Sequence, residues 1–387
     1  MRPITLPWKQ GVKLLQFLYN YSMEITQKET KSEDSVISLM REMGHEQVVF
    51  CNDNDTGLKA IIGIHNTVLG PALGGTRMWG YASDNDAAID ALRLSRGMTY
   101  KAAITGLNLG GGKAVLIGNA KTDKTEPFLR RFGKFIESLN GKYVTAEDVN
   151  MKTSDMEYIA METQHVTGLP SYLGGSGDPS PVTAYGTYLG MKAIAKKAYG
   201  SESLSGKKIW VQGVGQVGMY LTEHLRKENA EVYISDLDEE KLKNVSKSTG
   251  AKVIEGDPFA IDIDIYSPCA LGATLNDETI SKLNCDIIAG AANNQLKEEI
   301  KHGYALMERG IVYVPDFVIN AGGLINVYLD YLKEYTKERS YSMADKIYDN
   351  CLNVVNKAEN EKISPQEAAI ELAEKRIREV GNVKLSF

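Results

Sequence analysis

Two lysines, Lys101 and Lys113, have the residue type and the spacing to do chemistry, one as a cation that holds a carboxylate and the other as a base. Lys101 ends a helical pattern, and Lys113 follows twelve residues later, behind three glycines and before the apolar run 114–117. Burial or a neighbouring cation would bring the pKa of Lys113 from ~10.4 toward ~8, at a cost of about 3 kcal/mol. That range suits a general base. We expect Lys113 to be the base and Lys101, where it stays charged, to hold a carboxylate; for Lys101 a surface charge in the last helical turn is the alternative.

Asp148 directly follows a strand predicted over residues 142–146. Strand ends at a domain edge often carry chemistry, and they also often carry aspartates that only form turns. The spacing leaves both interpretations of Asp148 open. Its neighbour Glu147 would point to the opposite face, where we expect it to be solvated.

A glycine-rich turn, Gly-Val-Gly-Gln-Val-Gly over residues 213–218, follows one predicted strand and opens a predicted helix. Gly213 permits a sharp turn, and Gly215 lets the backbone approach a pyrophosphate. Gly218 lets the helix pack closely on the strand, while the helix N-terminus offers free N–H groups. The pattern therefore predicts a dinucleotide site, with a tight turn that binds no ligand as the alternative.

Asp236 ends the next predicted strand, eighteen residues after Gly218. A carboxylate there accepts hydrogen bonds from an adenosine ribose and repels a 2′-phosphate. We therefore predict NAD in preference to NADP. The expected contacts to the cofactor in this region are Gly213, Gly215, Gln216, Val217, Gly218 and Asp236.

Two kinds of hydrophobic pattern position these residues. From residue 35 to 166, helical patterns alternate with strand-like runs, as in an α/β domain with a mixed sheet. From Lys208 onward, strand, turn and helix recur, which demands a parallel, doubly wound sheet. The predicted strands are 47–50, 60–65, 142–146, 208–212, 232–235, 252–254, 264–267, 287–290 and 311–314. Two helices are predicted to begin at Ser83 or Asp84 and after Thr125. Three more are predicted over 216–227, 341–356 and 364–380.

The composition is that of a soluble α/β protein. The chain has 387 residues, 43% of them hydrophobic and 24% charged, which is enough for two or three domains. With 44 basic and 50 acidic residues its net charge is −6, which disfavours nucleic acid and membrane surfaces as partners. The four cysteines lack metal-ligand spacing, so we expect reduced thiols, no metal site and a cytoplasmic location. The apolar run 12–19 is too short to span a bilayer, and we interpret residues 1–22 as an extension, with a weak export signal as the alternative.

Six motifs, in order along the chain, resemble the family of glutamate, leucine, valine and phenylalanine dehydrogenases. The resemblance covers residues 35–378 and does not include residues 1–22. The motifs are GPALGGTR at 70–77, RGMTYK at 96–101, GGGKA at 110–114, TAEDV at 145–149, AANNQL at 291–296 and NAGGLINV at 320–327.

The resemblance implies a reversible oxidative deamination, in which an L-amino acid, NAD and water give a 2-oxo acid, ammonia and NADH. By this resemblance Lys101 binds the substrate α-carboxylate, Lys113 activates water, and Asp148 moves protons to and from the amino group. It also implies a deep cleft between two domains. We accordingly divide the chain into an N-terminal extension (1–34), a substrate-binding and oligomerisation domain (35–166), an NAD-binding Rossmann domain (167–350) and C-terminal helices that return to the first domain (351–387).

The same resemblance implies further contacts around the substrate and the nicotinamide. Gly74 and Gly75 would let the backbone approach the substrate, with Met98 nearby. Thr183 matches the family's hydroxyl contact to the carboxamide, and Asn294 matches a polar contact near the ribose and the substrate amine.

Five positions match the family's side-chain pocket: Leu73, Ala146, Thr167, Leu324 and Val327. Leu73 stands where glutamate dehydrogenases carry a lysine, so a glutamate side chain would be desolvated without a counter-charge. We expect an aliphatic substrate, leucine before isoleucine and valine, because one methylene is worth only about 1–3 kcal/mol. Leu324 replaces an expected valine, which keeps phenylalanine or tryptophan open as the preferred substrate. Asn293 stands where the nearest relatives would carry Asp.

Other partners follow from the family and from the charge. The resemblance implies a homo-oligomer, either an octamer or a dimer, with amino acid, 2-oxo acid and ammonia as small-molecule ligands. A binding protein that senses NAD without turnover is the alternative from another class. A DNA-binding version would need a basic face, which the acidic balance does not favour.

Overall fold

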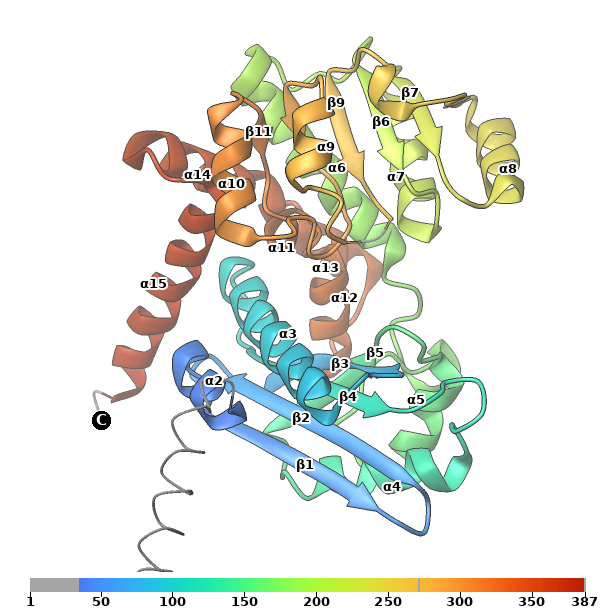
Figure 1. The fold of residues 1–387 in the computed structure, drawn as a ribbon, viewed down its shortest axis with the longest axis vertical. Coiled ribbons are helices and arrows are strands. Elements are labelled where there is room, and N and C mark those ends of the chain that lie inside the picture. Colours follow the sequence, from blue (N-terminus) through green and yellow to red (C-terminus); the bar gives the residue numbers. More distant parts are fainter. Residues whose placement is uncertain (1–34, 271, 386–387) are drawn as a thin grey trace, which may run out of the picture.

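The computed structural model describes residues 35–270 and 272–385. The predicted extension over residues 1–34 lies outside this range. The described chain forms two halves, each built on its own sheet, with helices between and around them (Figure 1). No helix in the described ranges combines the length and the apolar character needed to cross a bilayer.

The first half is a five-stranded mixed sheet in the order β1-β2-β4-β3-β5. β1 and β2 pair antiparallel, as do β2 and β4, whereas β3 runs parallel to β4 and to β5. The mixed sheet predicted from the sequence is therefore confirmed. Its strands and helices are α2 (Val36–Met43), β1 (Gln47–Asp53), β2 (Leu58–Asn66), β3 (Ala72–Trp79), α3 (Asp84–Ile104), β4 (Gly110–Ile117), α4 (Glu126–Glu137), β5 (Tyr143–Glu147) and α5 (Thr153–Ala160).

Caps define the starts of the two long helices in this half. Ser83 accepts a hydrogen bond from the Asp86 N–H at the start of α3, and Thr125 accepts one from the Phe128 N–H at the start of α4. Both helices begin where the sequence predicts. Strand β3 was not predicted, because Gly74 and Gly75 interrupt its hydrophobic pattern.

The second half is a six-stranded parallel sheet in the order β11-β10-β9-β6-β7-β8. Numbered along the chain from β6, this is the 3-2-1-4-5-6 order of a doubly wound sheet, whose ligands bind where the order reverses. The predicted fold class is confirmed. The elements are η1 (Ser171–Leu173), α6 (Ser180–Tyr199), β6 (Lys208–Gln212), α7 (Gln216–Lys227), β7 (Glu231–Ser235), α8 (Glu239–Thr249), β8 (Lys252–Val253), η2 (Pro258–Ala260), β9 (Ile265–Pro268), α9 (Asp277–Lys282), β10 (Ile287–Ile288), α10 (Glu299–Glu308) and β11 (Val312–Tyr313).

Five more helices follow in the described part of the chain. They are α11 (Asp316–Ile319), α12 (Gly322–Tyr331), α13 (Lys337–Ala344), α14 (Lys346–Glu361) and α15 (Pro365–Leu385). Two of them, α11 and α15, contact α3 of the first half. The helix predicted over 341–356 is divided by one residue, Asp345, into the end of α13 and most of α14. α15 leaves the second half and packs against α3 of the first (Figure 1), where Arg376 donates to the Leu107 carbonyl at 2.8 Å.

Candidate active site

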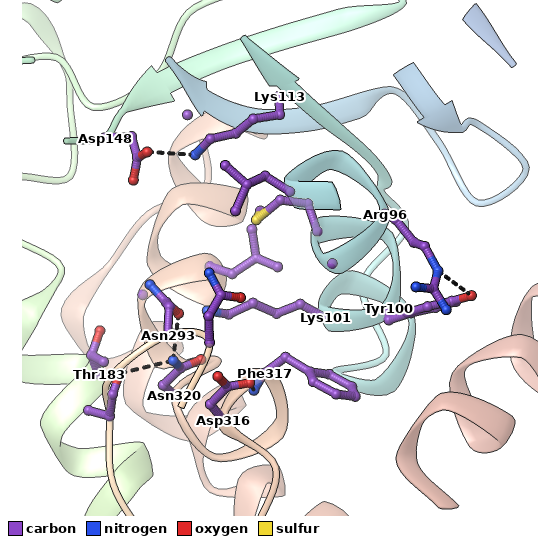
Figure 2. A pocket seen from close by; sticks show the side chains of 18 of the residues that line it. Arg96, Tyr100, Lys101, Lys113, Asp148, Thr183, Asn293, Asp316, Phe317 and Asn320 are labelled. Atoms are coloured by element: carbon purple, nitrogen blue, oxygen red, sulfur yellow. Dashed lines mark hydrogen bonds and ion pairs between the residues drawn. The ribbon is translucent and has the colours of Figure 1, made fainter. Parts of the chain in front are cut away.

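A cavity of about 420 Å³ lies between the two halves. In Figure 1 the sheet of the second half lies above and α3 lies below, between the two sheets. Figure 2 shows Lys101, Lys113, Asp148 and Asp316 around this space. Its lining includes the following residues singled out from the sequence: Leu73, Gly75, Met98, Lys101, Lys113, Ala146, Asp148, Thr183, Val217, Asn294, Leu324 and Val327.

Lys113 and Asp148 form an ion pair on the cavity wall. Lys113 sits in the buried strand β4, so its side chain is only 7% exposed, and Asp148 follows the end of β5. Lys113 Nζ donates to Asp148 Oδ2 at 2.7 Å, and Arg77 Nε donates to the same oxygen at 2.9 Å. One carboxylate is thus shared between two cations.

The surroundings shift the pKa of both partners. Burial lowers the pKa of the Lys113 ammonium, and the Asp148 carboxylate opposes that shift. Burial alone would raise the pKa of Asp148, but Lys113 and Arg77 bring it below its usual range. The lysine is therefore easier to deprotonate than usual, while the carboxyl stays ionised.

Lys101 reaches the same cavity from the last turn of α3. Its pKa is lowered to about 8, chiefly by burial and also by Lys113, against the opposing effect of Asp316. The sequence assigned a lowered pKa to Lys113 alone, so this is a correction: burial acts on both lysines, and Lys101 keeps its charge only below about pH 8.

Asp316 is a buried carboxyl in this cavity that sequence reasoning did not single out. Its oxygens accept hydrogen bonds from the backbone N–H groups of Gln295, at 3.0 Å, and Phe317, at 2.6 Å. Burial raises its pKa, and Lys101 counteracts this. It lies four residues before the NAGG motif, and only the fold brings it near Lys101.

Glycines allow the strands to approach closely beside the ion pair. A Cβ on Gly75 would lie 2.5 Å from the Glu147 carbonyl oxygen and 2.9 Å from Asp148 Cβ. A Cβ on Gly74 would lie 1.6 Å from the Gly112 carbonyl oxygen. Gly75 therefore leaves the room that Asp148 occupies. A Cβ on Gly74 would face the neighbouring strand, and Gly74 is not among the residues that line the cavity, so its contact with the substrate stays a prediction.

The apolar part of the cavity is formed by Leu73, Met98, Ala146, Leu324 and Val327. These side chains offer no counter-charge to a polar substrate group. The fifth expected pocket residue, Thr167, does not line the cavity. It is buried, and its hydroxyl donates to the Thr145 carbonyl at 3.2 Å.

The glycine turn has the backbone geometry of a close approach to a ligand. Gly213 has a φ of 95°, which favours glycine. A Cβ on Gly218 would lie 2.0 Å from the Gly213 carbonyl oxygen, whereas one on Gly215 would meet no atom within 4 Å. The N-terminus of α7 therefore opens onto free space at Gly215.

Asp236 lies beside this turn at the end of β7. Its Oδ2 accepts a hydrogen bond from the Val214 N–H at 2.8 Å, and its Oδ1 accepts one from the Asp238 N–H at 3.0 Å. These bonds fix the carboxylate next to the turn. Each oxygen keeps a second lone pair for a hydroxyl donor.

A group of amides lies near Thr183 on the cofactor side of the cavity (Figure 2). Asn320 Nδ2 donates to Asn293 Oδ1 at 2.7 Å and to the Ala291 carbonyl at 2.9 Å, while Asn320 Oδ1 is buried without a hydrogen-bond partner among the described residues. The Thr183 hydroxyl donates to the Pro179 carbonyl at 3.0 Å. Asn320 is the first residue of the NAGGLINV motif, and the sequence did not predict it as a site residue.

Asp277, Glu298 and His302 form a separate cluster of metal-ligand types, with ligand atoms within 4.8 Å of one another. His302 Nδ1 accepts a hydrogen bond from the Glu298 N–H at 2.9 Å, which puts the ring proton on Nε2. Nε2 lies 3.4 Å from Asp277 Oδ1. Because that proton occupies the lone pair that a metal ion would need, this arrangement does not favour metal binding.

Together, the fold and the site define a class: two-domain α/β proteins with a dinucleotide-type parallel sheet facing a lysine-rich cleft. Comparison with known proteins agrees. Residues 45–165 match the family described as Glu/Leu/Phe/Val dehydrogenase, dimerisation domain, and residues 174–238 and 233–383 match Glutamate/Leucine/Phenylalanine/Valine dehydrogenase. The chain belongs to this family.

Individual relatives cover nearly the whole chain. It is 51% identical over 353 residues to leucine dehydrogenase of Thermoactinomyces intermedius, which covers 91% of this chain and 96% of the relative. It is 46% identical to L-tryptophan dehydrogenase of Nostoc punctiforme, over 87% of this chain and 95% of the relative. The crystal structure of L-tryptophan dehydrogenase from Nostoc punctiforme superposes with a TM-score of 0.80 at 44% identity, covering 89% of this chain and 99% of that one.

Proposed function

We propose that this protein is an NAD-dependent L-amino acid dehydrogenase that reversibly deaminates aliphatic substrates, with leucine preferred over isoleucine and valine. The main observation behind this proposal is that Lys101, Lys113 and Asp148 line the same cavity as a group of apolar side chains. The chain belongs to a family of dehydrogenases and is 51% identical to a relative named leucine dehydrogenase. Both findings favour an enzyme over a protein that binds NAD without turnover.

The residues around the glycine turn fit NAD. Open space at Gly215 and the N-terminus of α7 suit a pyrophosphate, and the Asp236 carboxylate suits a ribose diol and disfavours a 2′-phosphate. Thr183 and Asn294 are the candidates for contacts to the nicotinamide half. When bound, NAD supplies the oxidant that accepts hydride from the substrate α-carbon.

The protein's own groups then account for binding and proton transfer. The Lys101 ammonium pairs with the substrate α-carboxylate. Asp148 is ionised at neutral pH because Lys113 and Arg77 hold its pKa low, and the carboxylate is therefore free to accept a proton from the substrate amino group. Lys113, deprotonated more easily than usual, takes a proton from the water that attacks the imino carbon.

The pocket favours an aliphatic side chain. Leu73 and Met98 supply an apolar wall, so a glutamate carboxylate would lose its hydration without compensation. An aromatic substrate is the second candidate. It is favoured by Leu324 in the pocket and by the 46% identical relative named L-tryptophan dehydrogenase.

The proposal extends to the assembly and to the location. We propose a homo-oligomer, an octamer or a dimer, because the first half matches a family part described as a dimerisation domain. We also propose a cytoplasmic location, based on four cysteines without disulfides.

The direct test is absorbance at the reduced-nicotinamide band with L-leucine and NAD, in neutral and in alkaline buffer. We expect NADH to form, and we expect the 2-oxo acid with ammonium and NADH to run the reaction backward. Asp236→Ala should weaken NAD binding and relax the preference over NADP. If no aliphatic or aromatic amino acid supports NADH formation, the proposal is wrong.

A further inference from the structure

Both cations that contact Asp148 bind the same oxygen. Lys113 Nζ lies 2.7 Å and Arg77 Nε 2.9 Å from Oδ2. Among the described residues no hydrogen bond reaches Oδ1. This arrangement orients the carboxyl group and leaves one oxygen available on the cavity wall.

Arg77 is itself held in place from the other side. Its Nη1 donates to Asp90 Oδ2 at 3.1 Å, and the Tyr81 hydroxyl donates to the same oxygen at 2.6 Å. The guanidinium plane therefore bridges Asp148, after β5, and Asp90, on α3. A planar fork with two separate donors can do this, whereas the single ammonium group of a lysine cannot hold both carboxylates in this geometry.

The charges around Asp148 come from three elements. Lys113 on β4 and Arg77 on β3 contact it, and Lys101 on α3 acts on it from across the cavity. Other titratable groups around it are Asp90, beyond Arg77, the buried phenol of Tyr143, and Glu147, which precedes Asp148 and also lines the cavity. Arg77 lowers the pKa of Asp148 and also that of Lys113, so it acts on both members of the ion pair.

We infer that Arg77 is a positioning residue for the reaction proposed above: it fixes the Asp148 carboxylate through Oδ2, directs Oδ1 toward the substrate amine, and weakens the hold of Asp148 on the Lys113 proton. This inference rests on the proposed function for the identity of the reaction. The ionisation of Lys113 that it describes can be measured without turnover.

The first experiment compares pH profiles of kcat/KM for L-leucine in three variants. Arg77→Gln should lower kcat/KM at neutral pH by about 100-fold and move the acid limb to higher pH, because Asp148 and Lys113 would both hold protons more readily. Arg77→Lys keeps the charge but loses the fork, so its acid limb should stay near that of the unmodified protein while kcat falls. Asp90→Asn removes the second anchor of Arg77 and should lower kcat, but its acid limb should not move to higher pH, because the Asp90 charge raises the pKa of Lys113.

Arg131→Gln is the matched control. It removes another arginine–aspartate pair of the same half, in which Arg131 Nε lies 2.9 Å from Asp53 on an exposed surface. We expect its pH profile and its NADH dissociation constant to remain unchanged. The NADH dissociation constant of the Arg77 variants should also remain unchanged, because Arg77 lies in the half opposite the glycine turn.

The second experiment measures Lys113 directly. Trace labelling with acetic anhydride, quantified by mass spectrometry of the Lys113 peptide, reports the deprotonated fraction at each pH. Its onset should move to higher pH in Arg77→Gln. If the unmodified protein forms no NADH with any amino acid, the proposed function fails. The labelling experiment then still tests whether Arg77 lowers the pKa of Lys113.

The inference is overturned if folded Arg77→Gln keeps both the acid limb and the Lys113 labelling profile of the unmodified protein. Should Arg77→Gln fail to fold, Arg77→Lys and Asp90→Asn decide by their kcat values. Unchanged kcat in both variants would overturn the inference equally.

Discussion

At the scale of single residues, the chemistry depends on two lysines with different partners. Lys113 shares Asp148 with Arg77 at hydrogen-bond distance. For Lys101 the largest charge effect after burial comes from Asp316. One lysine is therefore placed to exchange a proton with a carboxylate nearby, and the other is placed to receive the carboxylate of a ligand.

Replacing the proposed base should separate chemistry from cofactor binding. Lys113→Ala should lower kcat by about 100-fold or more, which is the usual contribution of a positioned acid or base. The dissociation constant of NADH, measured by fluorescence, should stay near its original value. Lys134→Ala, at a lysine that is 61% exposed on α4, serves as the control. A Lys113→Ala protein with full activity would remove Lys113 from the mechanism.

The pKa of Lys101 predicts how carboxylate binding depends on pH. Because its ammonium form persists below about pH 8, affinity for 4-methylpentanoate in the presence of NADH should be constant below that pH and fall above it. This ligand has no amino group, so it reports only the carboxylate contact. Lys101→Met should bind it weakly at every pH. Equal affinity at pH 7 and pH 10 in the unmodified protein would contradict the assignment.

At the scale of elements, the strands bring these side chains together because glycines let them approach. β3 lies between β4 and β5, so Arg77, Lys113 and Asp148 come from three adjacent strands. Alanine at Gly75 would meet both the Glu147 carbonyl and Asp148 Cβ. The backbone at this position thus determines where the carboxylate lies.

Gly75→Ala should lower kcat/KM strongly while the protein remains folded. The added methyl group must displace the segment around Asp148, and such overpacking costs about 1–3 kcal/mol of unfolding free energy. Gly80→Ala is the matched control, since a Cβ there meets no atom within 4 Å. Urea unfolding and steady-state kinetics measure the two effects. Equal activity in both variants would refute the proposed close contact.

A pair of histidines predicts acid sensitivity where α2, β2 and α3 meet. Burial lowers the pKa of His45 to about 4 and also lowers that of His65, whose ring centroid lies 4.7 Å away. Between about pH 6.5 and pH 4 the unfolded chain binds more protons than the folded one, so the free energy of unfolding should fall as the pH falls through this window. Urea midpoints across this range test this, and His45→Gln should flatten the dependence.

Element boundaries also show what the sequence could predict. The strand at 208–212 and the helix at 216–227 were predicted at their observed limits, because the glycine turn separates a clear apolar run from a clear helical one. β3 was missed, since two glycines erase its alternation. Arg77 and Asp316 were missed as site residues for another reason. Asp148, the partner of Arg77, lies 71 residues away in the chain, and Lys101, the partner of Asp316, lies in the other half of the molecule.

At the scale of the whole molecule, the cleft depends on connections between the halves. α15 returns from the second half to pack on α3, which carries Lys101 (Figure 1). The Gly168 N–H donates to Asp330 of α12 at 3.1 Å, and Asn326 of the same helix donates to Ser176 at 2.8 Å. The segment that joins the halves is thus held by α12, the helix that also supplies Leu324 to the apolar pocket.

The measurement that tests the central proposal most directly is kcat/KM with NAD for leucine, isoleucine, valine, phenylalanine, tryptophan and glutamate under one set of conditions. An apolar pocket walled by Leu73, Met98 and Ala146 predicts leucine first, isoleucine and valine within about 200-fold of it, and no detectable turnover of glutamate. A higher value for phenylalanine or tryptophan would replace the aliphatic substrate by an aromatic one. Efficient turnover of glutamate, or no NADH with any of the six, would contradict the account.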